Sequence, residues 1–175
     1  NTLSENEILS GYAEMLKHGL ISNAEHWGRL MRFDIDNPNL DMLQPLIMES
    51  IHTKEEIVKQ DPTEQHIRKA LNLGHTLAHA IEKCSQRYSH GEAVAIGLHY
   101  ITLSALSHSL INEADAKRIL AIIEQYGFVT ELPVERKLLL KAIEGDKKRK
   151  GNTIHLILPT AIGKVEDRVV KLSEL

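Results

Sequence analysis

The stretch from Glu64 to Glu82 constrains the fold more than any other part of the chain. It has no proline and a single glycine and is rich in leucine and alanine, which predicts a helix. At about 100° per residue, an arc of roughly 80° on this helix holds six polar side chains, namely Glu64, Arg68, Asn72, His75, His79 and Glu82. An ordinary interpretation of this segment alone is a solvent-exposed helix face whose two histidines have no function. The combination of acid, guanidinium, amide and imidazole predicts instead a face that binds a ligand.

The rest of the chain is also patterned mainly as helices. Apolar periodicity and capping residues predict further helices over residues 4–22, 24–33, 40–60, 90–111, 112–126 and 133–143. The helix that begins at His90 is apolar nearly all round, so we expect it at the centre of a bundle. Alternation over 153–158 and 165–170 predicts a β-hairpin. The fold class is therefore mainly α, a helical bundle with a small C-terminal β-hairpin, in one domain over residues 1–175.

Charge and composition exclude several classes of partner. The formal net charge is −3, which gives no basic surface for nucleic acid and no polybasic membrane patch. No apolar run approaches the roughly 20 residues that cross a bilayer, and the first residues do not resemble a signal peptide. Cys84 is the one cysteine, which excludes an internal disulfide and a thiolate metal site. We predict a cytoplasmic protein without nucleic-acid or membrane partners.

Several elements offer metal ligands to one place. His75 and His79 lie one helical turn apart, His90 opens the next helix, and Glu14 projects from the first helix. Two histidines and a glutamate with an open fourth position are typical of a catalytic zinc. The spacing leaves open which two of the three histidines bind the metal.

Basic and amide groups accompany these ligands. Arg68 and Asn72 share the same face, and Lys17, Lys54 and the Lys147–Lys148 loop can reach it. Cations and amide donors beside a metal suit a phosphate or carboxylate substrate. Each of these features also has an interpretation without a substrate. Glu14 and Lys17 would form a surface ion pair, Lys54 would extend to solvent, and the Lys147–Lys148 loop would simply be solvated. No GxGxxG or GxxxxGK[ST] motif occurs, so no dinucleotide site is expected within the chain.

Five segments, in this order, carry a resemblance to a known family: SGYAEMLKHGLI, RKALNLGHTLAHAIE, HGEAVAIG, GDKKRKGN and LPTAIGK. Together they span nearly the whole chain, which resembles the C-terminal domain of 3-dehydroquinate synthase. The family enzyme also has an N-terminal Rossmann-like domain that binds NAD. The resemblance implies that this domain is absent here and that the chain is an excised domain or a fragment. Leu77-Ala78 stands where the family often has Phe-Gly, at two packing positions.

The resemblance also implies roles for individual residues. It assigns the metal, Zn²⁺ or Co²⁺, to Glu14, His75 and His90, and catalytic roles to Lys17, Glu64 and His79. It assigns substrate contacts to Lys54, Arg68, Asn72, Lys147 and Lys148, with Lys147 the favoured lysine of the loop. It implies no cofactor-binding residue in this chain, because NAD is bound mainly by the other domain. The full-length family enzyme is expected to be a homodimer.

The activity that the resemblance implies is conversion of 3-deoxy-D-arabino-heptulosonate 7-phosphate to 3-dehydroquinate and phosphate, in the shikimate pathway. We expect the isolated chain to fold without turning over substrate. Another sugar phosphate cyclase would share the metal ligands, and a metal-dependent polyol dehydrogenase would lack a use for the basic residues. A metal phosphohydrolase is disfavoured because no adjacent His-Asp pair occurs. A helical interaction module leaves the polar face of 64–82 without a purpose.

Overall fold

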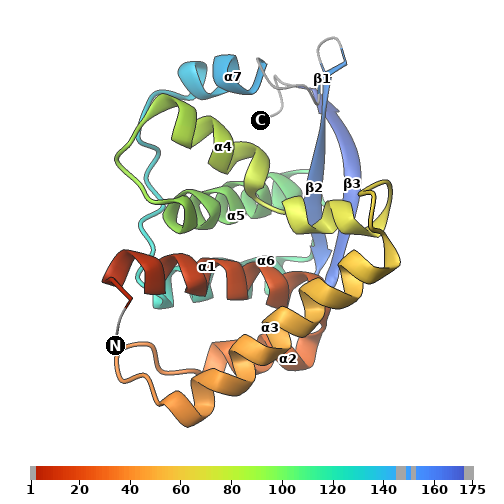
Figure 1. Ribbon diagram of the computed structural model, residues 1–175. Helices are drawn as coiled ribbons and strands as arrows, with labels where there is room; N and C mark the ends of the chain where they lie inside the picture. Colours follow the sequence, from red (N-terminus) through yellow and green to blue (C-terminus); the bar gives the residue numbers. More distant parts are fainter. Residues whose placement is uncertain (1–2, 145–148, 151–152, 172–175) are drawn as a thin grey trace.

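The computed structural model describes residues 3–144, 149–150 and 153–171 of the 175-residue chain. Its elements, in chain order, are α1 (Glu5–Ser22), α2 (Ala24–Arg32), α3 (Leu40–Gln60), the 3₁₀ helix η1 (Ile67–Asn72), α4 (His75–Cys84), α5 (His90–Ser107), α6 (Glu113–Gln125), α7 (Arg136–Glu144), β1 (Arg149–Lys150), β2 (Thr153–Ala161) and β3 (Lys164–Lys171). Figure 1 shows α7, α4, α5 and α1 stacked one below another, with β2 and β3 along one side. The predicted class, a helical bundle with a C-terminal hairpin, is confirmed.

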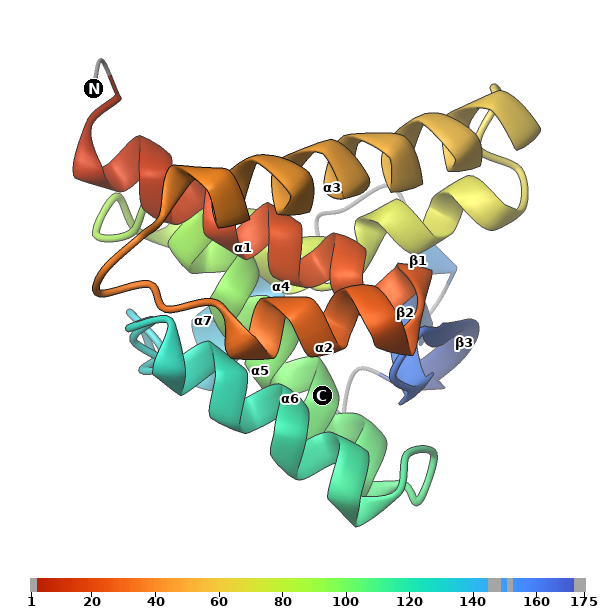
Figure 2. The same cartoon turned by 90° about the horizontal axis from the view of Figure 1, so that it is seen from below.

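Helix α5 forms the centre of the bundle, as its apolar sequence predicts. It packs against α1, α4, α6 and strand β2, and in Figure 2 it lies among these helices with α3 at the outer edge. Ten of its residues are buried, from Gly91 to Ala105. Gly97 allows a close approach, because an added Cβ would lie 2.2 Å from the carbonyl oxygen of Gly74 at the start of α4. The α4–α5 pair therefore depends on backbone contact.

Two capping boxes set where the site-bearing helices begin. Ser4 caps α1 together with Glu7, and Ser89 caps α5 together with Glu92. In each box the serine oxygen accepts from the glutamate N–H while the carboxylate accepts from the serine N–H, which satisfies donors that a helix start leaves free. The second box places His90 in the first turn of α5.

The C-terminal hairpin covers one side of the helices. β2 and β3 pair antiparallel, with Ile154 opposite Val170, and β1 adds a short third strand beside β2. Ile154, Leu156 and Leu158 are buried and belong to the common core. These alternate residues of β2 face the helices and complete the core beside α5.

The segment from Glu64 to Glu82 is not one helix, and that prediction is wrong. Its first half is the 3₁₀ helix η1, and its second half is α4, which begins at His75. Gly74 joins them with φ of 77°, a left-handed conformation that favours glycine. Glu64 itself has φ of 58°, outside any right-handed helix. The polar residues still share one side, but two elements present them.

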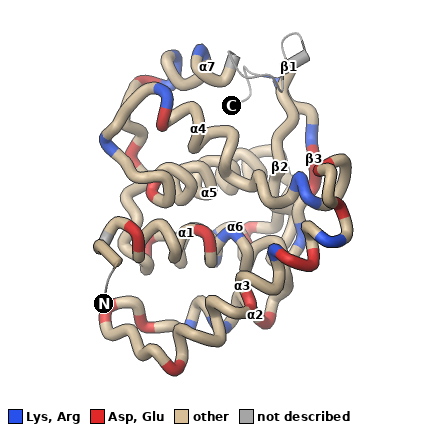
Figure 3. Tube along the Cα trace, in the orientation of Figure 1, with Lys and Arg blue, Asp and Glu red and all other residues tan. Residues whose placement is uncertain are grey.

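Charged residues are mixed along the surface. Figure 3 shows Lys and Arg interspersed with Asp and Glu along α3 and the segment that follows it, whereas α5 is almost entirely uncharged. No helix within the described ranges is long and apolar enough to cross a membrane.

Candidate functional site

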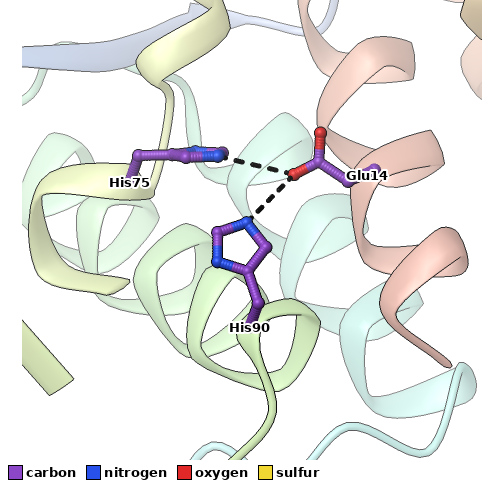
Figure 4. A group of neighbouring side chains, drawn as sticks. All are labelled: Glu14, His75 and His90. Carbon is purple, nitrogen blue, oxygen red and sulfur yellow. Dashed lines mark ion pairs between the residues drawn. The ribbon is translucent and has the colours of Figure 1, made fainter. Parts of the chain in front are cut away.

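Three side chains from three helices meet beside the centre of the bundle. Figure 4 shows Glu14 of α1 facing His75 of α4 and His90 of α5. Glu14 Oε1 lies 3.5 Å from His75 Nε2 and 4.0 Å from His90 Nε2. One ligand atom from each residue lies within 4.8 Å of the other two. The geometry brings together the three residues that the family resemblance assigns to a metal.

The outer nitrogen of each histidine has a partner that orients the ring. His75 Nδ1 lies 3.1 Å from the carbonyl oxygen of Leu73, so Nδ1–H donates to it. His90 Nδ1 lies 2.9 Å from Glu82 Oε1 and donates to that carboxylate. Both rings therefore turn the lone pair of Nε2 toward Glu14. Such outer partners are typical of histidines that bind metals.

Lys17 is buried beside the partly buried Glu14, so the interpretation of this pair as a surface ion pair is wrong. Lys17 Nζ donates to Glu14 Oε2 at 2.7 Å, and the lysine side chain is 4% exposed. Burial opposes ionisation of Glu14, but Lys17, His75 and His18 outweigh it and lower the pKa of the carboxyl. Burial lowers the pKa of Lys17, and Glu14 offsets part of that effect. One carboxylate oxygen is thus held by an ammonium and the other is directed at the histidines.

The donor set fits a divalent cation. Glu14 Oε1 is buried and has no hydrogen-bond partner within the described part of the chain, which is costly for a carboxylate oxygen. Burial, followed by the nearby Lys17, lowers the pKa of His75 to about 4, so the ring is neutral and its lone pair is free near pH 7. A carboxylate oxygen and two imidazole nitrogens suit zinc, cobalt or a similar ion.

A second group of polar side chains lies on η1 and the loop before it. Asn72 Nδ2 donates to Glu64 Oε1 at 2.5 Å, and Arg68 Nη1 donates to the carbonyl oxygen of Pro62 at 2.7 Å. Glu64 and Asn72 line a cavity of about 280 Å³ between η1 and the hairpin, with His155 and Asp167 on the hairpin side. The Asn72 amide has a second N–H and the Arg68 guanidinium has further N–H groups, and donors of this kind suit an anion.

The remaining predicted site residues are placed as follows. His79 packs edge-on to His75, with ring centroids 5.8 Å apart, and does not belong to the group of candidate metal ligands. Lys54 is exposed on α3 and is near enough to Lys17 to contribute to lowering the pKa of that ammonium. Lys147 and Lys148 lie outside the described residues.

Sequence reasoning missed three residues that support the site. Glu82 was placed on the polar face without a role, yet it holds His90. His18 is 5% exposed and lies with Nε2 3.9 Å from Glu14 Oε2, while its Nδ1 is 2.5 Å from Ser50 Oγ. Asp61 accepts three backbone hydrogen bonds from the loop that follows it. No pattern in the sequence pointed to His18.

Comparison with known proteins identifies relatives over nearly the whole chain. The family described as 3-dehydroquinate synthase C-terminal matches residues 11–149. The 3-dehydroquinate synthase of Parabacteroides distasonis is 41% identical over 171 residues, which cover 94% of this chain and 48% of the relative. That of Leptospira interrogans is 38% identical over 162 residues, covering 90% and 45%. The chain therefore spans about half the length of the curated relatives it matches.

Solved structures share the fold. The 2-epi-5-epi-valiolone synthase of Streptomyces hygroscopicus, determined with NAD⁺ and Zn²⁺ bound, superimposes with a TM-score of 0.85 at 22% identity, over 99% of this chain and 50% of that one. A 2-deoxy-scyllo-inosose synthase in complex with carbaglucose-6-phosphate, NAD⁺ and Co²⁺ gives 0.84 at 22% identity, over 99% and 52%. At these identities the likeness extends to the fold alone.

Proposed function

Because the chain belongs to the 3-dehydroquinate synthase family through its C-terminal domain, we propose that it carries the metal centre and one wall of the substrate site of such an enzyme. The proposed reaction converts 3-deoxy-D-arabino-heptulosonate 7-phosphate to 3-dehydroquinate with release of phosphate. The two curated relatives described above are both named 3-dehydroquinate synthase, which supports this activity over that of the other cyclases.

The observation that carries the proposal is the position of Glu14 Oε1. Within the described residues this carboxylate oxygen has no hydrogen-bond partner, and it faces the imidazoles of His75 and His90. We assign Zn²⁺ or Co²⁺ to Glu14, His75 and His90. When bound, such an ion supplies Lewis-acid polarisation of the substrate hydroxyl that is oxidised and of the resulting ketone. A ketone acidifies the adjacent C–H, which makes elimination of phosphate feasible.

The chain's own residues supply charge and orientation. Lys17 holds Glu14 by a partly buried hydrogen bond, and its ammonium favours the ionised form of that carboxyl. We assign Arg68 and Asn72, with Lys54, Lys147 and Lys148, to the carboxylate and phosphate of the substrate, because charge-assisted hydrogen bonds bind such anions strongly. His79, beside His75 and apart from the candidate ligands, is assigned to proton transfer near the phosphate, and Glu64 to holding Asn72 and substrate hydroxyls. Fixed donors of this kind accelerate reactions by orienting the substrate before charge develops.

NAD completes the proposed reaction. Oxidation and later reduction of the same substrate regenerate NAD⁺ within one turnover. No dinucleotide-binding fingerprint occurs in the sequence, so we assign NAD mainly to the part of the family enzyme that this chain does not match. By itself the 175-residue chain is then expected to bind metal without producing 3-dehydroquinate.

A chimera tests the activity. The chain replaces the matching half of the Parabacteroides distasonis enzyme, which it aligns with over 94% of its own length. With NAD⁺ and Zn²⁺ the chimera is expected to release phosphate and form 3-dehydroquinate, and the same chimera with Glu14→Gln is the control. A folded, zinc-loaded chimera that releases no phosphate from the heptulosonate substrate contradicts the proposal.

A further inference from the structure

A single carboxylate organises the loop that joins α3 to η1. Asp61 ends α3, is 5% exposed, and accepts three backbone N–H groups. Its Oδ1 accepts from Gln65 at 3.0 Å, and its Oδ2 accepts from His66 at 2.7 Å and from Arg68 at 3.1 Å. Burial works against ionisation, but these donors outweigh it and lower the pKa of Asp61. The side chain is therefore a fixed anion at neutral pH.

These bonds replace the cap that η1 lacks. His66 precedes η1 and makes no side-chain capping bond of its own. The first N–H groups of a helix need acceptors. Asp61 accepts that of Arg68 in the first turn of η1, and it also accepts those of Gln65 and His66 just before the helix. The carboxylate thereby ties the end of one helix to the start of the next.

The same loop holds Glu64 in an unfavourable conformation. Its φ of 58° is uncommon for a residue with a side chain and persists only where surrounding bonds determine it. Glu64 N lies 3.4 Å from the carbonyl oxygen of Asp61, so the strained residue lies inside the turn that Asp61 closes. That conformation lets Glu64 Oε1 accept from Asn72 at 2.5 Å, eight residues later.

We propose that Asp61 is the positioning residue of the anion-binding half of the site: by fixing the backbone from Asp61 to Arg68 it sets where Glu64, Arg68 and Asn72 present their polar groups. The anion-binding role of those side chains rests on the proposed function. The metal ligands come from α1, α4 and α5, so the action of Asp61 is separate from metal binding.

The test compares Asp61→Asn with a matched control in the 175-residue chain. The amide keeps the shape of the side chain but replaces one acceptor by a donor and removes the charge. Asp34→Asn is the control, because Asp34 Oδ1 also accepts two backbone N–H groups, from Asp36 at 3.1 Å and Asn37 at 3.2 Å, in an exposed turn elsewhere. Four quantities are measured by NMR and titration: exchange of the 65, 66 and 68 amides, the Asn72 side-chain amide signal, zinc affinity, and the Kd for inorganic phosphate.

In Asp61→Asn the three amides are expected to exchange about tenfold faster, and the Kd for phosphate to rise about tenfold, as loss of charge-assisted bonds implies. The Asn72 signal shifts toward that of a free amide, and zinc affinity stays within about twofold of the parent because no metal ligand lies on this loop. Asp34→Asn leaves all four quantities unchanged.

Unchanged exchange and an unchanged Asn72 signal in Asp61→Asn overturn the proposal, as does equal loss of zinc and phosphate, which indicates a general structural role. If the parent chain binds zinc but not phosphate, the anion site in the proposed function is wrong. Exchange and the Asn72 signal still decide whether Asp61 positions Glu64 and Asn72.

Discussion

Glu82 Oε1 lies 2.9 Å from His90 Nδ1, so a carboxylate on α4 orients a histidine on α5 whose other nitrogen faces Glu14. The bond fixes the proton on Nδ1 and leaves the Nε2 lone pair for a metal. Changing Glu82→Gln is expected to weaken zinc binding about 10- to 100-fold, which is typical when an outer partner of a ligand histidine is lost. A chelator competition titration measures it.

Glu131→Gln is the matched control for that change, because Glu131 is an exposed partner of Arg87. It is expected to leave zinc affinity unaltered. Equal affinity in parent and Glu82→Gln proteins would show that His90 does not depend on this carboxylate.

The two histidines of α4 are predicted to have different roles. His75→Ala removes a nitrogen that lies 3.5 Å from Glu14 Oε1, so the chain is expected to lose stoichiometric zinc. His79→Ala is expected to retain zinc, because His79 stands outside the group of candidate ligands. Elemental analysis of the two purified variants compares them directly, and loss of zinc from both would contradict the assignment.

Acid is predicted to destabilise the metal-free protein through His18. Burial, followed by the Lys17 charge, lowers the pKa of His18 to about 3 in the folded protein, while an unfolded histidine titrates near 6.5. Between these values the unfolded chain binds more protons, so stability is fully present above about pH 6.5 and falls with acidification. The slope is about 1.4 kcal/mol per pH unit for one proton.

Urea unfolding between pH 7 and pH 4 measures this slope. His18→Gln is expected to reduce the slope by about one proton's share and leave the share of His75, whose pKa is also lowered. His52→Gln, at an exposed site on α3, is expected to leave the slope unchanged. An identical pH dependence in the His18→Gln and parent proteins would show that His18 is not the group responsible.

Two glycines provide a matched test of close packing. Gly97→Ala would place a Cβ 2.2 Å from the carbonyl oxygen of Gly74, and backbone there cannot move without moving α4. We expect a loss of about 1–3 kcal/mol in the free energy of unfolding, together with weaker zinc binding, because His75 follows Gly74. Denaturant titration with and without zinc measures both effects.

Gly11→Ala is the control, since nothing lies within 4 Å of a Cβ added there. In the middle of α1 this change is expected to stabilise the protein by about 0.5–1 kcal/mol. Similar effects of the two substitutions would mean that the α4–α5 approach tolerates a side chain.

Much of the helical architecture could be predicted because its signals are local. The apolar pattern of α5 and the capping box that Ser4 forms with Glu7 lie within short windows of sequence, and the structure confirms both. The alternation that predicts the hairpin is equally local.

The break at Gly74 could not be predicted because the polar residues on both sides of it fit one continuous helix by spacing alone. The break coincides with the left-handed conformation of Gly74 and its close approach to Gly97, a contact that only the folded chain reveals. The contact between His18 and Ser50 joins residues that are 32 positions apart, so it too appears only in the folded chain.

The left-handed turn at Gly74 also has a consequence for how the protein can evolve. It uncouples the direction of η1 from that of α4, so substitutions between Asp61 and Asn72 can redirect polar side chains without rotating His75. Under the proposed function, substitutions in this segment are therefore expected to alter the preference for the anionic substrate while the candidate metal ligands Glu14, His75 and His90 stay in place.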